Sequence, residues 1–307
     1  MSRVETPTSQ RGGVGQWALA WRRFKKNRAA IAGLIIVGFF AFLAAFDRLI
    51  APYPPNCVPT PFSPFCTGQY APLHAPSFAH PFGTDSNSYD VYSQVIYGCR
   101  AAFYIGFGAT AVAMIVSVLI GLAAGYFGGT TDNLLMRLTE VFLVLPFFLI
   151  LLLFLKVLYY FSNTGAGGLE IEILIIGLFS WPGNARILRS EVLRVRGLEF
   201  IGASRQIGAS ASRILFRHIL PNVLHVLIVL TTLQIAASVL IEAGVSFLGF
   251  GDQSVATWGL EFYYGFNYIS DAWWVEAFPG IFLTLLVMGF NLLGNGLRDA
   301  LDPRLRE

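Results

Sequence analysis

The sequence predicts an all-α membrane protein that crosses a lipid bilayer about six times. Of its 307 residues, 55% are hydrophobic and only 13% are charged, against about 25% charged residues in an ordinary soluble domain. A soluble fold of this length could not remove so much apolar surface from water, whereas a protein in a bilayer does not need to. The net charge of +3 is small and scattered, which argues against a nucleic-acid partner.

Six apolar segments approach the length of about 20 residues that a membrane-spanning helix needs. They are expected near residues 29–50, 101–131, 134–158, 171–186, 222–248 and 277–297. The uncharged stretch from Ala29 to Phe46 is longer than a signal-peptide core and begins well inside the chain, so we expect a retained anchor there. The fourth segment is short and is expected to end at Trp181–Pro182–Gly183.

Basic residues predict the orientation, since Lys and Arg concentrate on the cytoplasmic side of a membrane protein. The N-terminal tail and segment 186–217 carry seven of the 21 basic residues each, and the C-terminal tail adds three. Six crossings place all three regions on one side. We therefore expect a cytoplasmic tail at 1–28, a first transmembrane helix at 29–50, an extracytoplasmic loop at 51–98, a core with five further helices at 99–298 that includes a cytoplasmic loop at 184–221, and a cytoplasmic tail at 299–307.

The predicted cytoplasmic loop has the composition of a docking site. It is expected to form a short helix, a turn near Gly208, a second helix and a proline, Pro221, at the start of the fifth span. Its first helix carries small residues such as Gly202 and Ala203, which allow another surface to approach the backbone closely. Flanking arginines give this helix a positive rim.

This loop resembles the signature of inner-membrane permease subunits of ATP-binding-cassette (ABC) importers, in the dipeptide/oligopeptide/nickel branch. That signature reads Glu-Ala-Ala, three residues, Gly, about nine residues, then Ile-x-Leu-Pro. Gly202 stands in place of the Glu, Ser204 in place of the second Ala, and His218 in place of the Ile. The resemblance implies that the residues coupling this chain to ATPases are Glu199, Gly202, Ala203, Ser204, Arg205, Gly208, Ala209, Leu220 and Pro221.

Four further segments resemble motifs of the same family, in the same order along nearly the whole chain. They are His80-Pro81-Phe82-Gly83-Thr84-Asp85 in the outer loop, Tyr126-Phe127-Gly128-Gly129 with Asp132 and Met136-Arg137 between spans two and three, Ser246-Phe247-Leu248-Gly249-Phe250-Gly251 after span five, and Asn291 to Asp299 with Leu301-Asp302-Pro303-Arg304 at the C-terminus.

The resemblance implies a type I ABC importer permease fold with a cytoplasmic coupling helix, in a prokaryotic plasma membrane. The implied partners are a second permease subunit, two ABC ATPase subunits and an extracytoplasmic solute-binding protein. ATP and magnesium would bind the ATPases, and no cofactor would bind this chain. In agreement, none of the three lysines follows a glycine, as a P-loop requires.

The cargo and the class of transporter have alternatives. The resemblance favours di- or oligopeptides, but the same branch also moves nickel and oligosaccharides. A stand-alone secondary transporter would need broken helices in corresponding positions of two halves, and no such symmetry is visible. An intramembrane enzyme would need paired catalytic residues within the spans, and His225 has no evident nucleophile beside it. We therefore predict a pore-forming subunit without catalytic residues.

Single residues suggest two further sites. Glu242 lies within the fifth span, where an ionisable group is costly and often functional, so it is a candidate for the substrate pathway or for a clamp to a neighbouring helix. Cys57 and Cys66 share an extracytoplasmic loop, where an oxidising compartment favours a disulfide. With His74 and His80 they could instead bind zinc, but the spacing matches no standard zinc site, so no metal is predicted. Cys99 is expected to be a buried free thiol.

Overall fold

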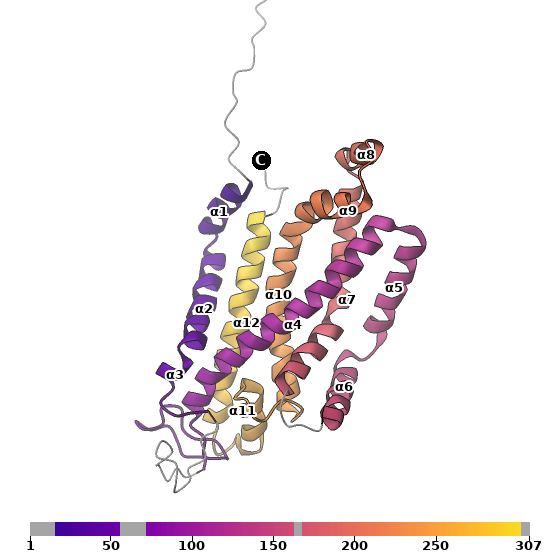
Figure 1. Cartoon of the computed structure of the whole chain (residues 1–307). Coiled ribbons are helices and arrows are strands. Elements are labelled where there is room, and N and C mark those ends of the chain that lie inside the picture. The colour runs from indigo at the N-terminus through magenta and orange to yellow at the C-terminus, as the bar shows by residue number, and fades with distance from the viewer. Residues whose placement is uncertain (1–15, 56–71, 163–167, 302–307) are drawn as a thin grey trace, which may run out of the picture.

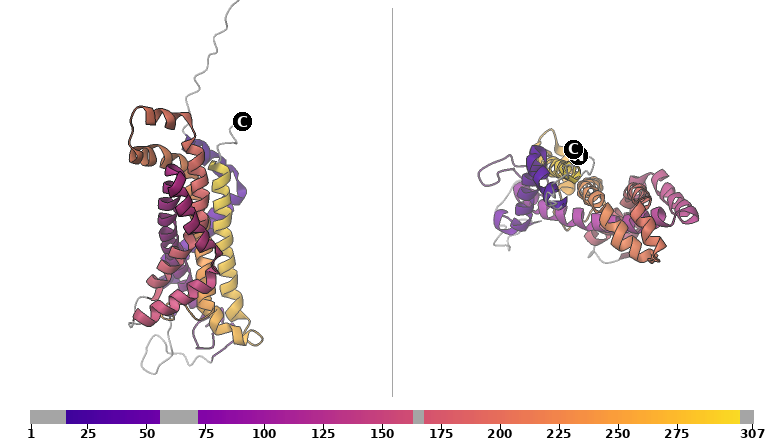
Figure 2. Two further views of the ribbon diagram at one scale, coloured as in Figure 1. Left: turned by 90° about the vertical axis from the view of Figure 1, so that its right-hand side faces the viewer. Right: turned by 90° about the horizontal axis from the view of Figure 1, so that it is seen from above.

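The chain folds into an elongated bundle of helices, seen from three directions in Figures 1 and 2. The computed structural model describes residues 16–55, 72–162 and 168–301, and these contain no β-strand beyond one isolated bridge between Thr84 and Asp90. Within these residues, five helices are long and apolar enough to cross a membrane, and a bent pair of helices raises the number to six if the pair forms one span. The predicted all-α architecture is confirmed.

The helices follow one another along the chain, and the longest connection, residues 51–90, lies between α3 and α4. They are α1 (Gln16–Lys26), α2 (Arg28–Ala45), α3 (Asp47–Ile50), α4 (Val91–Phe127), α5 (Gly129–Val144), α6 (Phe147–Ser162), α7 (Gly168–Arg196), α8 (Glu199–Gln206), α9 (Ala211–Arg213), the π-helix η1 (Ile214–Ile219), α10 (Leu220–Phe247), α11 (Trp258–Gly265), the 3₁₀-helix η2 (Phe266–Tyr268) and α12 (Trp274–Leu301).

The bundle has two distinct ends, which we call the α8 end and the α11 end. In Figure 1, α1, the last turn of α12 and α8 lie together at the top, and α3, α6 and α11 lie at the bottom. The basic residues of α1, those of the α7–α8 segment and Arg298 of α12 therefore share one end, as six crossings require. This arrangement agrees with the charge pattern used to predict the orientation.

The third predicted span, 134–158, is not one straight helix. It consists of α5 and α6, whose axes differ by 86° across a short break. Pro146 lies in the break, and Leu145 before it is extended, with φ −63° and ψ 138°. Proline lacks an amide donor and forces the preceding residue out of the helical region, so the prediction of a continuous span is wrong here.

The fourth span does not end at Trp181–Pro182–Gly183, because α7 continues through Pro182 to Arg196. The reason is close packing against α4 on both sides of the proline. A Cβ on Gly177 would lie 2.8 Å from the Ala109 carbonyl oxygen, and a Cβ on Gly121 would lie 3.0 Å from the Ala185 carbonyl oxygen. Tertiary contact thus holds a helix that local sequence alone would end.

The first and last spans are also joined by close backbone contact. A Cβ on Gly33 of α2 would lie 2.6 Å from the Leu293 backbone nitrogen and 2.8 Å from the Gly289 carbonyl oxygen of α12. Small residues at such contacts are typical of helix pairs in membranes, because van der Waals packing replaces the hydrophobic effect there. By contrast, a Cβ on Gly38, also in α2, would meet nothing within 4 Å.

This difference predicts the effect of substitution. Gly33→Leu should separate α2 from α12 and lower the free energy of unfolding by about 1–3 kcal/mol or more, as overpacking does. Gly38→Leu is the matched control and should leave it nearly unchanged. Thermal unfolding of the two purified variants in detergent, followed by circular dichroism, measures both, and an equal loss in both would contradict the proposed contact.

Candidate functional site

The α8 helix projects beyond the bundle at its α8 end, between the end of α7 and the start of α9 (Figures 1 and 2). Ile201 anchors α8 to the bundle, because its side chain is fully buried in a cluster with Leu188, Val192 and Ile219. Arg205 adds a second attachment, because its guanidinium lies 5.2 Å from the centre of the Tyr126 ring, within the range of a cation–π interaction. The helix is therefore fixed to α7, to η1 and to the end of α4.

The other side of α8 is open. Gly202 is exposed, and a Cβ there would meet nothing within 4 Å. A glycine inside a helix costs about 1 kcal/mol relative to alanine, and no contact within the described chain requires one here. A bare helix surface of this kind leaves room for the close approach of another molecule.

Gly208 has a different reason to be glycine. Its φ of +79° lies in the left-handed region, and it follows the last turn of α8, where Ala209 N–H donates to the Ser204 carbonyl at 3.1 Å. Glycine is the usual residue at this position of a helix C-terminus. Gly208 therefore shapes the turn that leads from α8 to α9.

The turn between α4 and α5 is clasped to α7 beneath α8. The Arg196 guanidinium donates to the Gly125 carbonyl at 3.3 Å, and the Arg189 guanidinium bonds both oxygens of the Asp132 carboxylate. Bidentate arginine–carboxylate pairs fix geometry as well as charge. Two segments that the sequence analysis singled out separately, around Tyr126–Asp132 and in the predicted loop, thus form one structural unit.

Pro221 lies near the start of α10, preceded by η1. The Leu220 N–H donates to the Leu215 carbonyl, five residues back, which is the π-helical pattern. π-Helical turns are rare and occur often at functional sites. Here α9, η1 and α10 follow one another without a gap. We call α8, α9 and η1 together the α8 unit. Leu220 and Pro221 connect this unit to a spanning helix, α10.

Two carboxylates lie inside the bundle toward its α11 end. Glu242 of α10 is 2% exposed and accepts a hydrogen bond from the Ser246 hydroxyl at 2.8 Å. Glu172 of α7 is fully buried, and neither oxygen has a hydrogen-bond partner of ordinary geometry among the described residues. This hydrogen bond of Glu242 lies within α10, and its role in the pathway or as a clamp to a neighbouring helix stays a prediction. The sequence analysis gave Glu172 no role, although acidic residues beside an apolar span signal one.

A chain of uncharged polar groups links three spanning helices. The Asn184 amide of α7 donates to Gln234 Oε1 of α10 at 2.7 Å, and Gln234 Nε2 donates to the Ser238 hydroxyl at 3.3 Å. That hydroxyl lies 3.4 Å from the Thr110 hydroxyl of α4. Polar side chains across membrane helices hold them in register. The sequence analysis missed these residues, since they carry no charge and their partners are distant in the chain.

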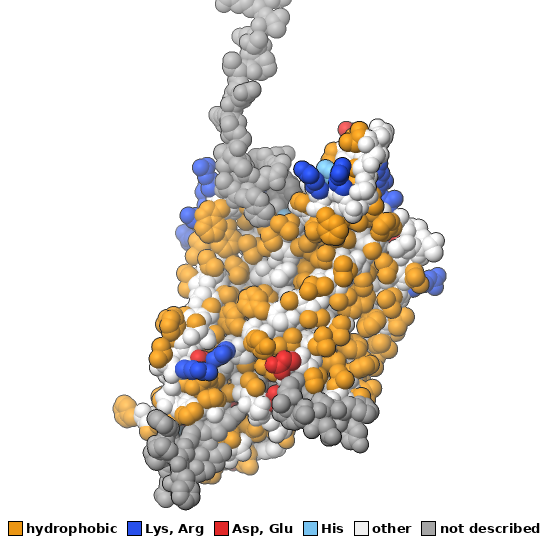
Figure 3. Space-filling view, viewed as in Figure 1, with side chains coloured by type: hydrophobic (Ala, Val, Ile, Leu, Met, Phe, Trp, Pro, Cys, Tyr) orange, Lys and Arg blue, Asp and Glu red, His pale blue; other side chains and the backbone are white. Residues whose placement is uncertain are grey.

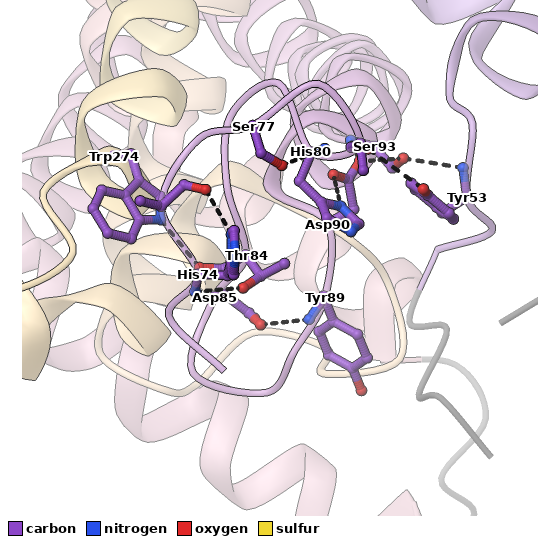
Figure 4. A network of polar contacts seen from close by, with 12 residues as sticks. Tyr53, His74, Ser77, His80, Thr84, Asp85, Tyr89, Asp90, Ser93 and Trp274 are labelled. Atoms are coloured by element: carbon purple, nitrogen blue, oxygen red, sulfur yellow. Dashed lines mark hydrogen bonds and ion pairs between the residues drawn. The ribbon is translucent and has the colours of Figure 1, made fainter. Parts of the chain in front are cut away.

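At the α11 end, the predicted outer-loop motif forms the polar network shown in Figure 4. The His80 ring lies 2.7 Å from the Asp90 carboxylate, which also caps α4 by accepting from Ser93 N–H at 2.8 Å. The Thr84 carbonyl accepts from the Trp274 indole at 3.1 Å, which joins the loop to α12. The motif therefore has a clear structural role, as it ties the loop to two spans.

Two buried carboxyl groups near this network have raised pKa values. Burial, opposed by hydrogen bonds from the Tyr89 and Asn87 amides, raises the pKa of Asp85 from 3.8 to about 7. Burial, followed by the charges of Asp85 and Asp90, raises the pKa of Glu261 in α11 well above its usual range. Both effects favour the neutral acid.

The cysteines divide into two cases. Cys57 and Cys66, the predicted disulfide, lie outside the described residues. Cys99 is a buried free thiol, as expected. Of the two histidines considered for zinc, His80 is engaged with Asp90 and His74 Nδ1 lies 2.8 Å from the Ala75 carbonyl. Within the described part of the chain, no three metal-ligating side chains gather into a site.

Comparison with solved structures gives the class of fold. The fold is similar to a chain of an inward-facing MetNI methionine ABC transporter, with a TM-score of 0.55 and 21% sequence identity over 68% of this chain and 96% of that one. A second crystal form of MetNI gives a TM-score of 0.57 at 20% identity. The chain therefore has the type I ABC importer permease fold.

Sequence comparison then gives the family. Residues 117–307 match the model of the binding-protein-dependent transport system inner membrane component, and residues 15–81 match the N-terminal TM domain of oligopeptide transport permease C. The dipeptide transport system permease protein DppC of Bacillus subtilis is 36% identical, covering 94% of this chain and 85% of that protein. The DppC protein of Alkalihalophilus pseudofirmus is 35% identical over 98% and 94%, and the oligopeptide permease protein OppC of Bacillus subtilis is 32% identical over 95% and 90%.

The chain belongs to the family of inner-membrane components of binding-protein-dependent transport systems. It is a membrane permease subunit of an ABC transport system, and its family implies ATPase and substrate-binding partners.

The raised pKa of Asp85 predicts a dependence of stability on pH. Because the folded state binds the proton more tightly than the unfolded state, the stabilisation is fully present below about pH 4 and is lost as the pH rises to about 7. Asp85→Asn, which stays neutral, should therefore lose less thermal stability than wild type between about pH 5 and about pH 8.

Thermal unfolding across this pH range, measured in detergent, checks the prediction. Asp271→Asn removes an exposed carboxyl from the same end of the bundle and is the matched control. If Asp85→Asn and Asp271→Asn changed the pH dependence equally, the buried carboxyl would not be its cause.

Proposed function

We propose that this chain forms half of the substrate pathway of an ATP-driven importer, with a second permease subunit forming the other half. Movement of two ATPase subunits would be transmitted through α8 and would alternate access to the pathway by rigid-body motion of packed helices. Hydrolysis would take place on the ATPases, which would bind ATP and magnesium. This chain would carry no catalytic residue and no cofactor.

The observation that carries the proposal is the open surface of α8. Its buried side is fixed by Ile201 and Arg205, while the surface at Gly202 has no neighbour within the described chain. A helix fixed in this way moves with α7, η1 and the end of α4 when something pulls on it. This supports a role in coupling for the residues between Glu199 and Ala209, with Leu220 and Pro221 at the link to α10.

The proposed orientation places the α8 end in the cytoplasm and the α11 end outside a prokaryotic plasma membrane. The basic residues gathered at the α8 end support it, because Lys and Arg favour the cytoplasmic side. The outer-loop network would then face the extracytoplasmic binding protein. Contact between α8 and cytoplasmic ATPases would test this orientation together with the coupling.

The proposed cargo is a di- or oligopeptide. The support comes from relatives at 32–36% identity whose names describe dipeptide or oligopeptide transport. The alternatives within the same kind of transporter are nickel and oligosaccharides. A secondary transporter working alone is a remote alternative, which the projecting α8 unit does not favour.

If α8 transmits the movement of the ATPases, the substitution Gly202→Arg should block this coupling. The substitution adds bulk and charge where the described chain leaves open space, so the subunit should still fold. ATP hydrolysis stimulated by the binding protein should fall about tenfold or more in the reconstituted complex, since a misplaced contact can cost that much. Gly208 is a poorer target, because its positive φ would strain any replacement.

Ala29→Arg is the matched control, because Ala29 is exposed on α2 at the same end of the bundle but far from α8. It should leave stimulated hydrolysis unchanged. Full stimulation in Gly202→Arg would show that ATPases do not dock at this surface. Uptake by the chain alone, without ATPases, would show that it is a secondary transporter.

The cargo proposal predicts that proteoliposomes containing the complete transporter accumulate a labelled dipeptide only when ATP and the binding protein are both present. Nickel ion and an oligosaccharide should not accumulate above the level without ATP. ATP-dependent uptake of either of these in place of the peptide would contradict the peptide assignment and leave the permease role intact.

A further inference from the structure

A cavity of about 660 Å³ opens beside α3 and α4 at the α11 end of the bundle. Its walls come from α3 and the residues just after it, from α4, from the start of α7 and from the segment after α10. They include Asp47, Arg48, Tyr97, Arg100 and Tyr104. Figure 3 shows a patch of basic and acidic atoms at the level of α3 and the start of α4, on a face that is otherwise mostly apolar. Cavities of this size hold small ligands.

The charges in the cavity favour an anion. Asp47 is 3% exposed and accepts hydrogen bonds from its neighbour's amide, Arg48 N–H, at 2.7 Å and from Arg100 Nη1 at 3.4 Å. The Arg100 side chain remains 59% exposed, and no carboxylate of the described residues forms an ion pair with the Arg48 guanidinium. Among the side chains that line the cavity, two guanidinium groups and one carboxylate leave a net charge of +1, which a single phosphodiester balances. The Asp252 carboxylate, which accepts from the hydroxyl of the lining residue Ser254 at 2.6 Å, is not one of them.

The position of the cavity along the bundle matches the boundary between membrane and water. Arg100 immediately precedes the part of α4 from 101 to 127, which carries no charged residue. Tyr97 and Tyr104 lie about one helical turn on either side of Arg100, and tyrosine is enriched at the level of lipid headgroups. The arginines therefore lie where the phosphate of a lipid lies.

An apolar stripe on α4 leads from the cavity into the membrane. The stripe consists of four side chains that are 51–63% exposed, Tyr104, Phe107, Ile115 and Leu119. Their spacing places them on one face of α4, between Arg100 and the α8 end. From Arg100 to Ile115 the stripe extends about 22 Å, more than the depth of about 15 Å of one leaflet of hydrocarbon. An acyl chain suits this surface.

We propose that this cavity and stripe bind an anionic phospholipid of the outer leaflet, with its phosphate between Arg48 and Arg100 and an acyl chain along α4. A transported peptide with a carboxylate is the alternative occupant. From Tyr104 toward the α8 end, the stripe offers no side-chain hydrogen-bond group. A peptide backbone needs such partners in a membrane, so the lipid is favoured. The proposal depends on the proposed orientation for its leaflet and not on the cargo.

Native mass spectrometry of the complete transporter tests the proposal. After lipid removal, phosphatidylglycerol and phosphatidylethanolamine are added back separately. Wild type should retain one phosphatidylglycerol with an affinity about tenfold or more above that of the double variant Arg48→Gln/Arg100→Gln, since each basic group near a membrane surface contributes to binding anionic lipid. Phosphatidylethanolamine should bind more weakly than phosphatidylglycerol.

Lys156→Gln is the matched control, because it removes an exposed basic group from α6 at the same end of the bundle. It should retain the lipid, and an equal loss in this variant would overturn the proposal by showing nonspecific attraction. Dihexanoyl phosphatidylglycerol should bind more weakly than the long-chain lipid if the stripe takes part, and equal binding would overturn that part.

Three further outcomes would overturn the proposal. Displacement of the lipid by inorganic phosphate at equal concentration would reduce the site to an anion site without acyl contact. Arginine-dependent binding of a dipeptide without lipid would assign the cavity to cargo. Retention by the isolated chain but not by the complete transporter would mean that a partner subunit covers the stripe.

Discussion

The close packing of α4 against α7 is the contact on which the rest of the structure depends. At Gly177 and Gly121 the two helices approach so closely that a Cβ would meet the partner's backbone. This contact keeps α7 helical through Pro182 and carries it on to Arg196. Because α7 extends so far, its arginines reach the turn after α4, and α8 begins beyond the end of the bundle.

The same pair of helices explains how the α8 unit could move as one body. Ile201 and Arg205 attach α8 to a cluster that contains side chains of α7 and to the Tyr126 ring of α4. The η1 helix continues this unit into α10 without a break. A displacement of α8 would therefore reach three spanning helices together, which is what a rigid-body mechanism of alternating access requires.

Polar groups inside the bundle lie in layers. The amide and hydroxyl chain from Asn184 to Thr110 joins α7, α10 and α4. Nearer the α11 end lie the buried carboxyls Glu172 and Glu242, and beyond them the network around His80 and Asp90 ties the loop to α4. In a membrane such groups are costly unless they bond to one another. The chain from Asn184 to Thr110 does so, and it fixes the register of three helices whose apolar surfaces would otherwise slide.

The sequence by itself determined the class of fold, the positions of most spans and the common side of the three basic regions, because hydropathy and charge are set residue by residue. It also identified the α8 segment and the outer-loop motif. Only the tertiary structure decided that Pro146 breaks its span while Pro182 does not, since the difference lies in what packs on either side. The burial of Glu242, the clasp at Asp132 and the cavity beside Arg100 depend in the same way on residues distant in the chain, whose contacts no local pattern specifies.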